Sequence, residues 1–168
     1  WQYRTYGAAM RQESDVEQAI AQYADMIRHI CLVYMKNESD TEDVFQDVFL
    51  KYALFSEPFD SEEHRKAWLI RVTINRCKDV LRSFFRRNTC SLEEAMAVAA
   101  PDSGDLSHVL EAVIRLPEKY KILVYLHYYQ GYSAVEIAGI LHKKVNTVYT
   151  HLARARAELK DMLGGDEG

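Results

Sequence analysis

Proline and glycine are scarce in this chain, with 3 Pro and 7 Gly among 168 residues. Proteins built from sheets and tight turns use more of both, and here 48% of the residues are hydrophobic and fall in short, dispersed clusters. The composition therefore favours an all-α protein. Long apolar runs are also missing, since none approaches the roughly 20 residues that a membrane-spanning helix needs, and we expect no signal peptide.

The three cysteines, Cys31, Cys77 and Cys90, form no C-x-x-C pair and follow no common spacing. Neither a zinc site nor a disulfide framework is indicated, so we expect no metal, no cofactor and a reducing, cytoplasmic setting. Cys31 and Cys77 are predicted core thiols, whereas Cys90 falls in a predicted linker. A glycine-rich phosphate loop and a nucleophile–base pattern are lacking too, which argues against an enzyme, although six scattered histidines leave an assembled site open.

Charges are segregated along the sequence. The net charge of -4 alone argues against a nucleic-acid partner. However, residues 37–63 hold nine acidic side chains and one basic, Lys51, whereas residues 65–87 hold eight basic side chains and one acidic, Asp79. Neighbouring stretches of opposite sign predict two surfaces that attract different partners.

Apolar residues at spacings of three and four predict two amphipathic helices near the amino terminus. We expect capping boxes to start them, Ser14 with Glu17 in the first and Ser39 with Glu42 in the second. The outer face of the second helix carries two carboxylates, an amide and a leucine: Asp43, Asp47, Gln46 and Leu50. Such a face is solvated by default, but an exposed leucine ringed by acids also suits a basic partner helix.

A third predicted helix follows the break at Pro58, begins at a Ser61 cap and continues to Arg86 or Arg87. One of its faces is a basic stripe that fits a phosphate backbone: Arg71, Asn75, Lys78, Arg82 and Arg86. Trp68 could stack on a base, but an indole within the run AWLI is more often part of the core.

Residues 88–104 are small, acidic and turn-forming, which is typical of a linker. Beyond it we expect a domain of four helices. Asp105 or Ser107 caps the first, which ends at Arg115, and Pro117 lies in the first turn of the second. Gly131 ends the second helix as a left-handed cap. The inward residues of this second helix are predicted as Ile122, Leu123, Leu126 and Tyr129.

The last two of these helices have the pattern of a helix-turn-helix over residues 132–160. Ser133 and Glu136 form a capping box at its start. In the second helix the buried side is predicted as Val148, Leu152, Ala155 and Leu159. The opposite side carries groups that reach base edges and phosphates: Tyr149, Thr150, His151, Arg154 and Arg156. A plain helical hairpin with a solvated basic face is the alternative.

Three segments resemble a known family. The segments TEDVFQDVFLKYALF and KAWLIRVTINRCKDVLRSFFRR are similar to the polymerase-binding and minus-10-reading domain of sigma-70-type sigma factors of the extracytoplasmic-function (ECF) group. The helix-turn-helix, with its runs EIA, TV and RAR, resembles the promoter-reading domain of the same family. It also resembles stand-alone LuxR-type transcriptional regulators, which have no such amino-terminal half. The sigma-factor resemblance spans about Asp15 to Leu163.

The resemblance implies two small helical domains, residues 10–87 and 105–163, joined by a flexible linker that threads through polymerase channels. It implies a sigma factor that binds core RNA polymerase, recognises minus-10 and minus-35 elements of promoter DNA, and meets an anti-sigma factor. The residues implied to dock on the polymerase β′ subunit are Asp43, Gln46, Asp47 and Leu50. Those implied to hold the minus-10 strand are Arg71, Asn75, Lys78 and Arg82.

The turn before the predicted recognition helix departs from the family pattern. Lys143, Lys144 and Asn146 stand where the family usually has an apolar residue, a small hydroxyl cap and a glycine. Because lysine is a poor N-cap, we expect the helix to start late, with Asn146 as its cap. Base contacts in the minus-35 element are then expected from Asn146, Thr147, Thr150 and His151. Phosphate contacts are expected from Lys143, Lys144, Arg154 and Arg156.

Overall fold

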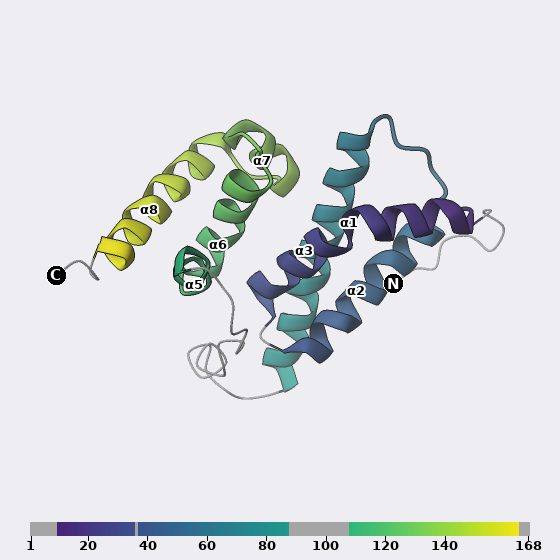
Figure 1. The fold of residues 1–168 in the computed structure, drawn as a ribbon, viewed down its shortest axis with the longest axis horizontal. Helices are drawn as coiled ribbons and strands as arrows, with labels where there is room; N and C mark the ends of the chain where they lie inside the picture. Colours follow the sequence, from purple (N-terminus) through teal and green to yellow (C-terminus); the bar gives the residue numbers. More distant parts are fainter. Residues whose placement is uncertain (1–9, 36, 88–107, 165–168) are drawn as a thin grey trace. The chain divides into compact units, whose positions relative to one another are not determined.

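The computed structural model describes residues 10–35, 37–87 and 108–164, the side chains of residues 84–87 and 108–110 excepted, and within them it is helical without strands (Figure 1). The predicted all-α fold is confirmed. The chain divides at residues 84 and 85 into two compact units. The predicted linker, residues 88–104, lies outside the described residues. Of the helices that are described, none is long and apolar enough to cross a membrane.

The first unit contains α1 (Glu13–Tyr34), α2 (Glu38–Leu54) and α3 (Glu62–Arg87). Buried side chains from all three helices form its core: Ile27, Ile30, Val44, Val48, Tyr52, Leu69 and Ile70. Cys31 of α1 and Cys77 of α3 are both buried, with their Sγ atoms 4.0 Å apart, which confirms that they are core thiols. Cys90 lies outside the described residues.

The starts of α1 and α2 differ from the predictions. α1 begins at Glu13 after Gln12, so Ser14 lies inside the first turn and the predicted capping box is wrong. In α2 the cap is Asn37, whose Oδ1 accepts a hydrogen bond from the backbone N–H of Asp40 at 2.7 Å. Asparagine is as good an N-cap as serine and lies two residues earlier than Ser39, so the helix starts there.

The start of α3 agrees with the prediction. Ser61 Oγ accepts a hydrogen bond from the backbone N–H of His64 at 3.1 Å, and the helix continues to Arg87. Trp68, in its second turn, packs against Phe55 and Phe59 with ring centroids 4.9 and 5.6 Å apart. Its indole therefore belongs to an aromatic cluster under the α2–α3 loop, as the core interpretation predicted.

A buried arginine ties the three helices together. Arg65 is 6% exposed, and its guanidinium donates to Asp15 of α1 at 3.3 Å and to the Tyr52 hydroxyl of α2 at 3.2 Å. Burial by itself raises the pKa of Asp15, but hydrogen bonds from Tyr52 and Arg11 outweigh that effect and leave the pKa below its usual value. Asp15 is therefore held as a carboxylate in this network.

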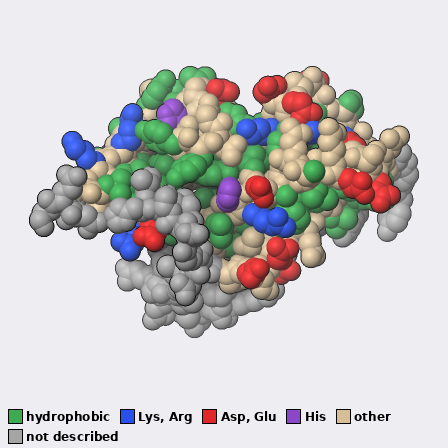
Figure 2. All heavy atoms as spheres, in the orientation of Figure 1, with side chains coloured by type: hydrophobic (Ala, Val, Ile, Leu, Met, Phe, Trp, Pro, Cys, Tyr) green, Lys and Arg blue, Asp and Glu red, His purple; other side chains and the backbone are tan. Residues whose placement is uncertain are grey.

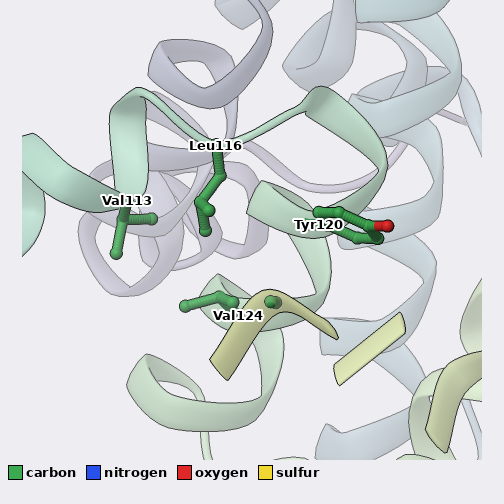
Figure 3. Close-up of a cluster of buried hydrophobic side chains, with 5 residues drawn as sticks. Val113, Leu116, Tyr120 and Val124 are labelled. Atoms are coloured by element: carbon green, nitrogen blue, oxygen red, sulfur yellow. The ribbon is translucent and has the colours of Figure 1, made fainter. Parts of the chain in front are cut away.

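The second unit contains α5 (His108–Ile114), α6 (Glu118–Val124), η1 (Tyr125–Tyr129), α7 (Ala134–Leu141) and α8 (Val145–Gly164). In its core Val113, Leu116, Tyr120 and Val124 form one buried cluster with Ala155 of α8. Figure 3 labels the first four of these side chains. The cap of α5 lies outside the described residues, and α5 ends at Ile114, one residue before the predicted end. Pro117 precedes α6 as its N-cap, one position outside the predicted first turn.

A π-helical turn, η1, replaces the expected end of the second predicted helix. The backbone N–H of Gln130 donates to the carbonyl of Tyr125 at 3.1 Å, five residues earlier. This wider turn moves Tyr129 off the buried face of Ile122, Leu123 and Leu126, and Tyr129 is 50% exposed. The prediction that Tyr129 faces inward is wrong. Gly131 follows with φ +75°, which confirms the left-handed cap.

Candidate nucleic-acid interface and docking face

The helix-turn-helix is built from local capping contacts. Ser133 Oγ accepts from the Glu136 N–H at 3.1 Å, and the Ser133 N–H donates to Glu136 Oε1 at 3.2 Å, so the predicted capping box is confirmed. α7 ends at Leu141, and His142 takes the left-handed conformation with φ 53°. This reverses the chain within residues 142–144 and lets α8 begin at Val145.

The predicted late start of the recognition helix is wrong. Asn146 lies within the first turn of α8, where its carbonyl accepts from Thr150 Oγ1 at 2.9 Å. The left-handed His142 ends α7 early enough for α8 to begin at Val145, one residue before Asn146. The consequence for the site is that Lys144 immediately precedes α8, and Asn146 and Thr147 both belong to its first turn.

The two sides of α8 separate as the sequence predicts. Val148, Leu152 and Ala155 are buried, and Leu159 packs partly buried against the core cluster. The predicted DNA-contacting residues that are exposed are Lys144, Asn146, Thr150, Arg154 and Arg156. Lys143 and Thr147 are half-buried. The exposed side therefore presents an amide, a hydroxyl and cations on one rigid helix.

His151 stands apart from that exposed set. Its ring is half-buried, packs edge-on against Tyr120 of α6 with centroids 5.5 Å apart, and places Nδ1 where no described group hydrogen-bonds to it. Burial lowers the pKa of His151, and the nearby cations Lys143, Lys119 and Arg154 lower it further. A neutral imidazole turned toward α6 is suited to holding α8 in place.

The outer face of α2 is exposed as predicted. Asp43 and Gln46 are exposed, and Leu50 lies beside them with 54% of its surface exposed. Asp47 is only half-buried on the same face, because its Oδ2 accepts from Arg76 Nε of α3 at 2.7 Å. On the face of the molecule shown in Figure 2, most of the visible acidic side chains lie over the first unit.

The basic stripe of α3 lies next to this face. Asn75 and Arg82 are exposed, Arg71 and Lys78 are half-buried, and Arg82 lies 3.6 Å from Asp79. The side chain of Arg86 is outside the description. A groove separates α2 from α3, and its lining comes from both helices: Asp47, Val48, Lys51, Val72, Asn75, Arg76 and Asp79. The groove thus brings Asp47 of the docking residues beside Asn75 of the basic stripe.

Arg76 is the functional candidate that the sequence did not single out. It lies within the basic run of residues 65–87 but falls between the two stripes of α3. Only the pairing of α2 with α3 shows that it neutralises Asp47. In the described parts of the chain, no group of three His, Cys, Asp or Glu side chains is placed to hold a metal ion.

Comparison with known proteins assigns the two units to one family. Residues 19–87 match the family model "Sigma-70 region 2", and residues 107–159 match "Sigma-70, region 4". The RNA polymerase sigma factor CnrH of Cupriavidus metallidurans is 30% identical over 147 residues, which cover 77% of this chain and 76% of CnrH. The chain belongs to the ECF group of the sigma-70 family. It is a sigma factor that directs RNA polymerase to promoters, and the LuxR-like alternative is not favoured.

Further relatives of this sigma factor share a lower sequence identity with it. The ECF RNA polymerase sigma factor SigW of Bacillus subtilis is 25% identical over 158 residues, covering 84% of each chain. A solved structure of the sigma factor RpoE in complex with the anti-sigma factor NepR from Bartonella quintana has a TM-score of 0.72 at 21% identity, covering 90% of this chain and 98% of RpoE. The structure of CnrH in complex with the cytosolic domain of CnrY has a TM-score of 0.63 at 23% identity, covering 95% of this chain and 94% of CnrH. These two structures support the fold.

Proposed function

We propose that this sigma factor works through three surfaces: the docking face of α2, the basic stripe of α3 and the exposed side of α8. The observation that carries the proposal is the groove between α2 and α3, where Asp47 of the docking face lies beside Asn75 of the basic stripe. A single small unit can then bind a basic protein helix and a nucleic-acid strand together.

The docking face is Asp43, Gln46, Asp47 and Leu50, and its proposed partner is a basic coiled coil of the polymerase β′ subunit. The exposed leucine supplies apolar contact area, and the surrounding carboxylates pair with cations of the partner. An exposed leucine on the same face as the carboxylates suits an interface at this position.

The basic stripe is proposed to hold the melted non-template strand of the minus-10 element. Arg71, Lys78 and Arg82 neutralise phosphates, and the exposed amide of Asn75 reads one base. Asn75 offers one donor and one acceptor to the pairing edge of a base that has left the duplex. The loop before α3, residues 55–61, borders the same strand.

The exposed side of α8 is proposed to enter the major groove of the minus-35 element. Residues of its first two turns meet base edges: Asn146, Thr147 and Thr150. The cations that flank them meet phosphates: Lys143, Lys144, Arg154 and Arg156. Because His151 is turned toward Tyr120, we assign it to fixing α8 against α6 instead of contacting a base.

The proposed domain bounds are residues 10–87 and 105–163, with residues 88–104 as the linker, and the family matches at 19–87 and 107–159 support them. The family is one of transcription initiation factors. We propose that the chain itself carries no catalysis and acts in the cytoplasm, where polymerase and promoters are. The similarity to RpoE bound to the anti-sigma factor NepR supports an anti-sigma partner for this chain as well.

The deciding experiment is run-off transcription by the chain with core RNA polymerase on templates randomised at both promoter elements. We expect transcripts only when both proteins are present, and we expect the transcribed templates to share two sequence elements. A control without polymerase measures binding of the chain alone to duplex DNA. Tight binding of the chain alone to duplex DNA, without stimulated transcription, would refute the proposal. That result would favour the alternative of a stand-alone transcriptional regulator.

A further inference from the structure

Arg11, which lies ahead of α1, reaches across to the carboxyl end of α2 and to the loop that follows it. Its backbone N–H donates to the carbonyl of Ala53 at 2.9 Å. Its side chain donates from Nε to the Tyr52 carbonyl at 3.1 Å and from Nη2 to the Glu57 carbonyl at 2.6 Å. One residue therefore holds both the last turn of α2 and the backbone of the loop at residues 55–61.

These contacts supply hydrogen-bond donors to the carboxyl end of α2. The last carbonyls of a helix lack partners within it, and a positive charge near them is favourable. The planar guanidinium of Arg11 presents several donors at fixed angles, so it spans the end of α2 and the Glu57 carbonyl together. A lysine ammonium has a single nitrogen and cannot hold both groups in this geometry.

The guanidinium also contacts two aromatic rings and a carboxylate. It lies over the rings of Tyr52 and Phe59, 4.6 and 4.8 Å from their centroids, and Asp15 of α1 accepts from Nη1 at 3.1 Å. Only 11% of the Arg11 side chain is exposed. Because Phe59 packs in turn on Trp68 of α3, Arg11 fixes the loop at both its beginning and its middle.

We propose that Arg11 is a positioning residue for promoter recognition. Arg11 sets the conformation of the loop at residues 55–61, and this conformation determines which bases are preferred at one end of the minus-10 element. The inference rests on the proposed role of α3 and this loop. Ser61 and Asn75 are fourteen residues apart, about 21 Å along the helix. At 3.4 Å per stacked nucleotide, a strand laid along α3 reaches the loop within about six nucleotides. The exposed side chains of Ser56, Glu57 and Asp60 lie there.

Arg65 provides a matched control within the same unit. Its side chain is 8% exposed, and it shares Asp15 and Tyr52 with Arg11. The partners of its side chain lie on the three helices, and none of the described hydrogen bonds of its guanidinium reaches residues 55–61. Replacing Arg65 with lysine therefore damages the same network without releasing the loop.

The test compares R11K, R65K, N75A and the unchanged chain as holoenzymes on a template library randomised at the minus-10 element. R11K should reduce base preference at one end of the element by about fivefold, the factor that one net hydrogen bond represents. Preference at the position read by Asn75 and affinity for core polymerase should stay unchanged. R65K should lower the melting temperature and leave every base preference as it was.

Hydrogen exchange supplies a readout that needs no promoter. The amide hydrogens of residues 55–57, 59 and 60 should exchange faster in R11K than in R65K, at equal helical content. Equal changes of base preference in both variants, or an unchanged preference in R11K, would overturn the inference. If the unchanged holoenzyme shows no minus-10 preference, the proposed function fails and this inference with it. If only N75A alters preference, the proposed function stands and the role of Arg11 is refuted.

Discussion

Arg76 and the polymerase are proposed to compete for the carboxylate of Asp47. Replacing Arg76 should therefore strengthen the binding of this chain to the polymerase. Its Oδ2 lies 2.7 Å from Arg76 Nε, and the two side chains are 38% and 34% exposed. The same carboxylate belongs to the proposed docking face for the polymerase. Docking then requires Asp47 to exchange Arg76 for a cation of the β′ subunit. Removing the guanidinium in R76A should therefore tighten core binding.

The size of the effect follows from the exposure of the pair. A partly exposed ion pair contributes ~0.2–1 kcal/mol, so R76A should lower the dissociation constant by about 1.5-fold to fivefold. In contrast, D47N removes a charge that becomes desolvated in the interface. Such pairs are worth ~2 kcal/mol or more, so D47N should raise the dissociation constant by about 30-fold or more. The two variants thus act in opposite directions.

The assay is competition binding to core RNA polymerase against a labelled copy of the unchanged chain. D79N serves as the control, because Asp79 lines the same groove with 53% of its side chain exposed but lies outside the docking face. It should leave core affinity unchanged. A weaker affinity of R76A would refute competition for Asp47, and unchanged affinity of D47N would remove Asp47 from the interface altogether.

Three further predictions concern the nucleic-acid surfaces and acid stability. On a minus-10 library N75A should blur preference at one position and R82A should reduce open complexes on all promoters alike; identical profiles would contradict the division of roles. In fluorescence anisotropy on a minus-35 duplex, R154A should flatten the slope of log affinity against log salt by about one unit, and an unaltered slope would exclude a phosphate contact. Because the folded pKa of Asp15 lies below its unfolded value, its contribution is complete above pH of about 4 and fades as pH falls through the folded pKa. Urea unfolding should therefore show D15N and the unchanged chain converging in stability at low pH, and a constant difference would argue against the network.

What the sequence predicted well depends on contacts between near neighbours. The capping box of Ser133 and Glu136, the Ser61 cap and the left-handed Gly131 each involve residues within a few positions. The apolar stripe from Val148 to Leu159 is likewise a matter of helical period. These features depend on local geometry, so the order of residues is enough to place them.

What it predicted poorly depends on partners that are distant in the chain or on rare backbone states. Arg11 meets residues more than forty positions away, and Asp47 meets Arg76 only because α2 packs beside α3. The π turn after Val124 has no strong signature in the residues themselves, which is why the exposure of Tyr129 was missed. A left-handed His142 is equally unexpected, because side chains other than glycine seldom adopt φ 53°.

The two core thiols, Cys31 and Cys77, can be used to detect separation of α1 from α3 in the first unit. Cys31 and Cys77 have no exposed surface, so a thiol-labelling reagent reaches them only when α1 and α3 separate. When that separation is rapid and reversible compared with labelling, the rate of labelling measures the fraction of molecules in which the two helices are apart. Comparing the labelling of Cys31 and Cys77 in the free and the polymerase-bound chain would show whether docking on α2 tightens the packing of the two helices behind it.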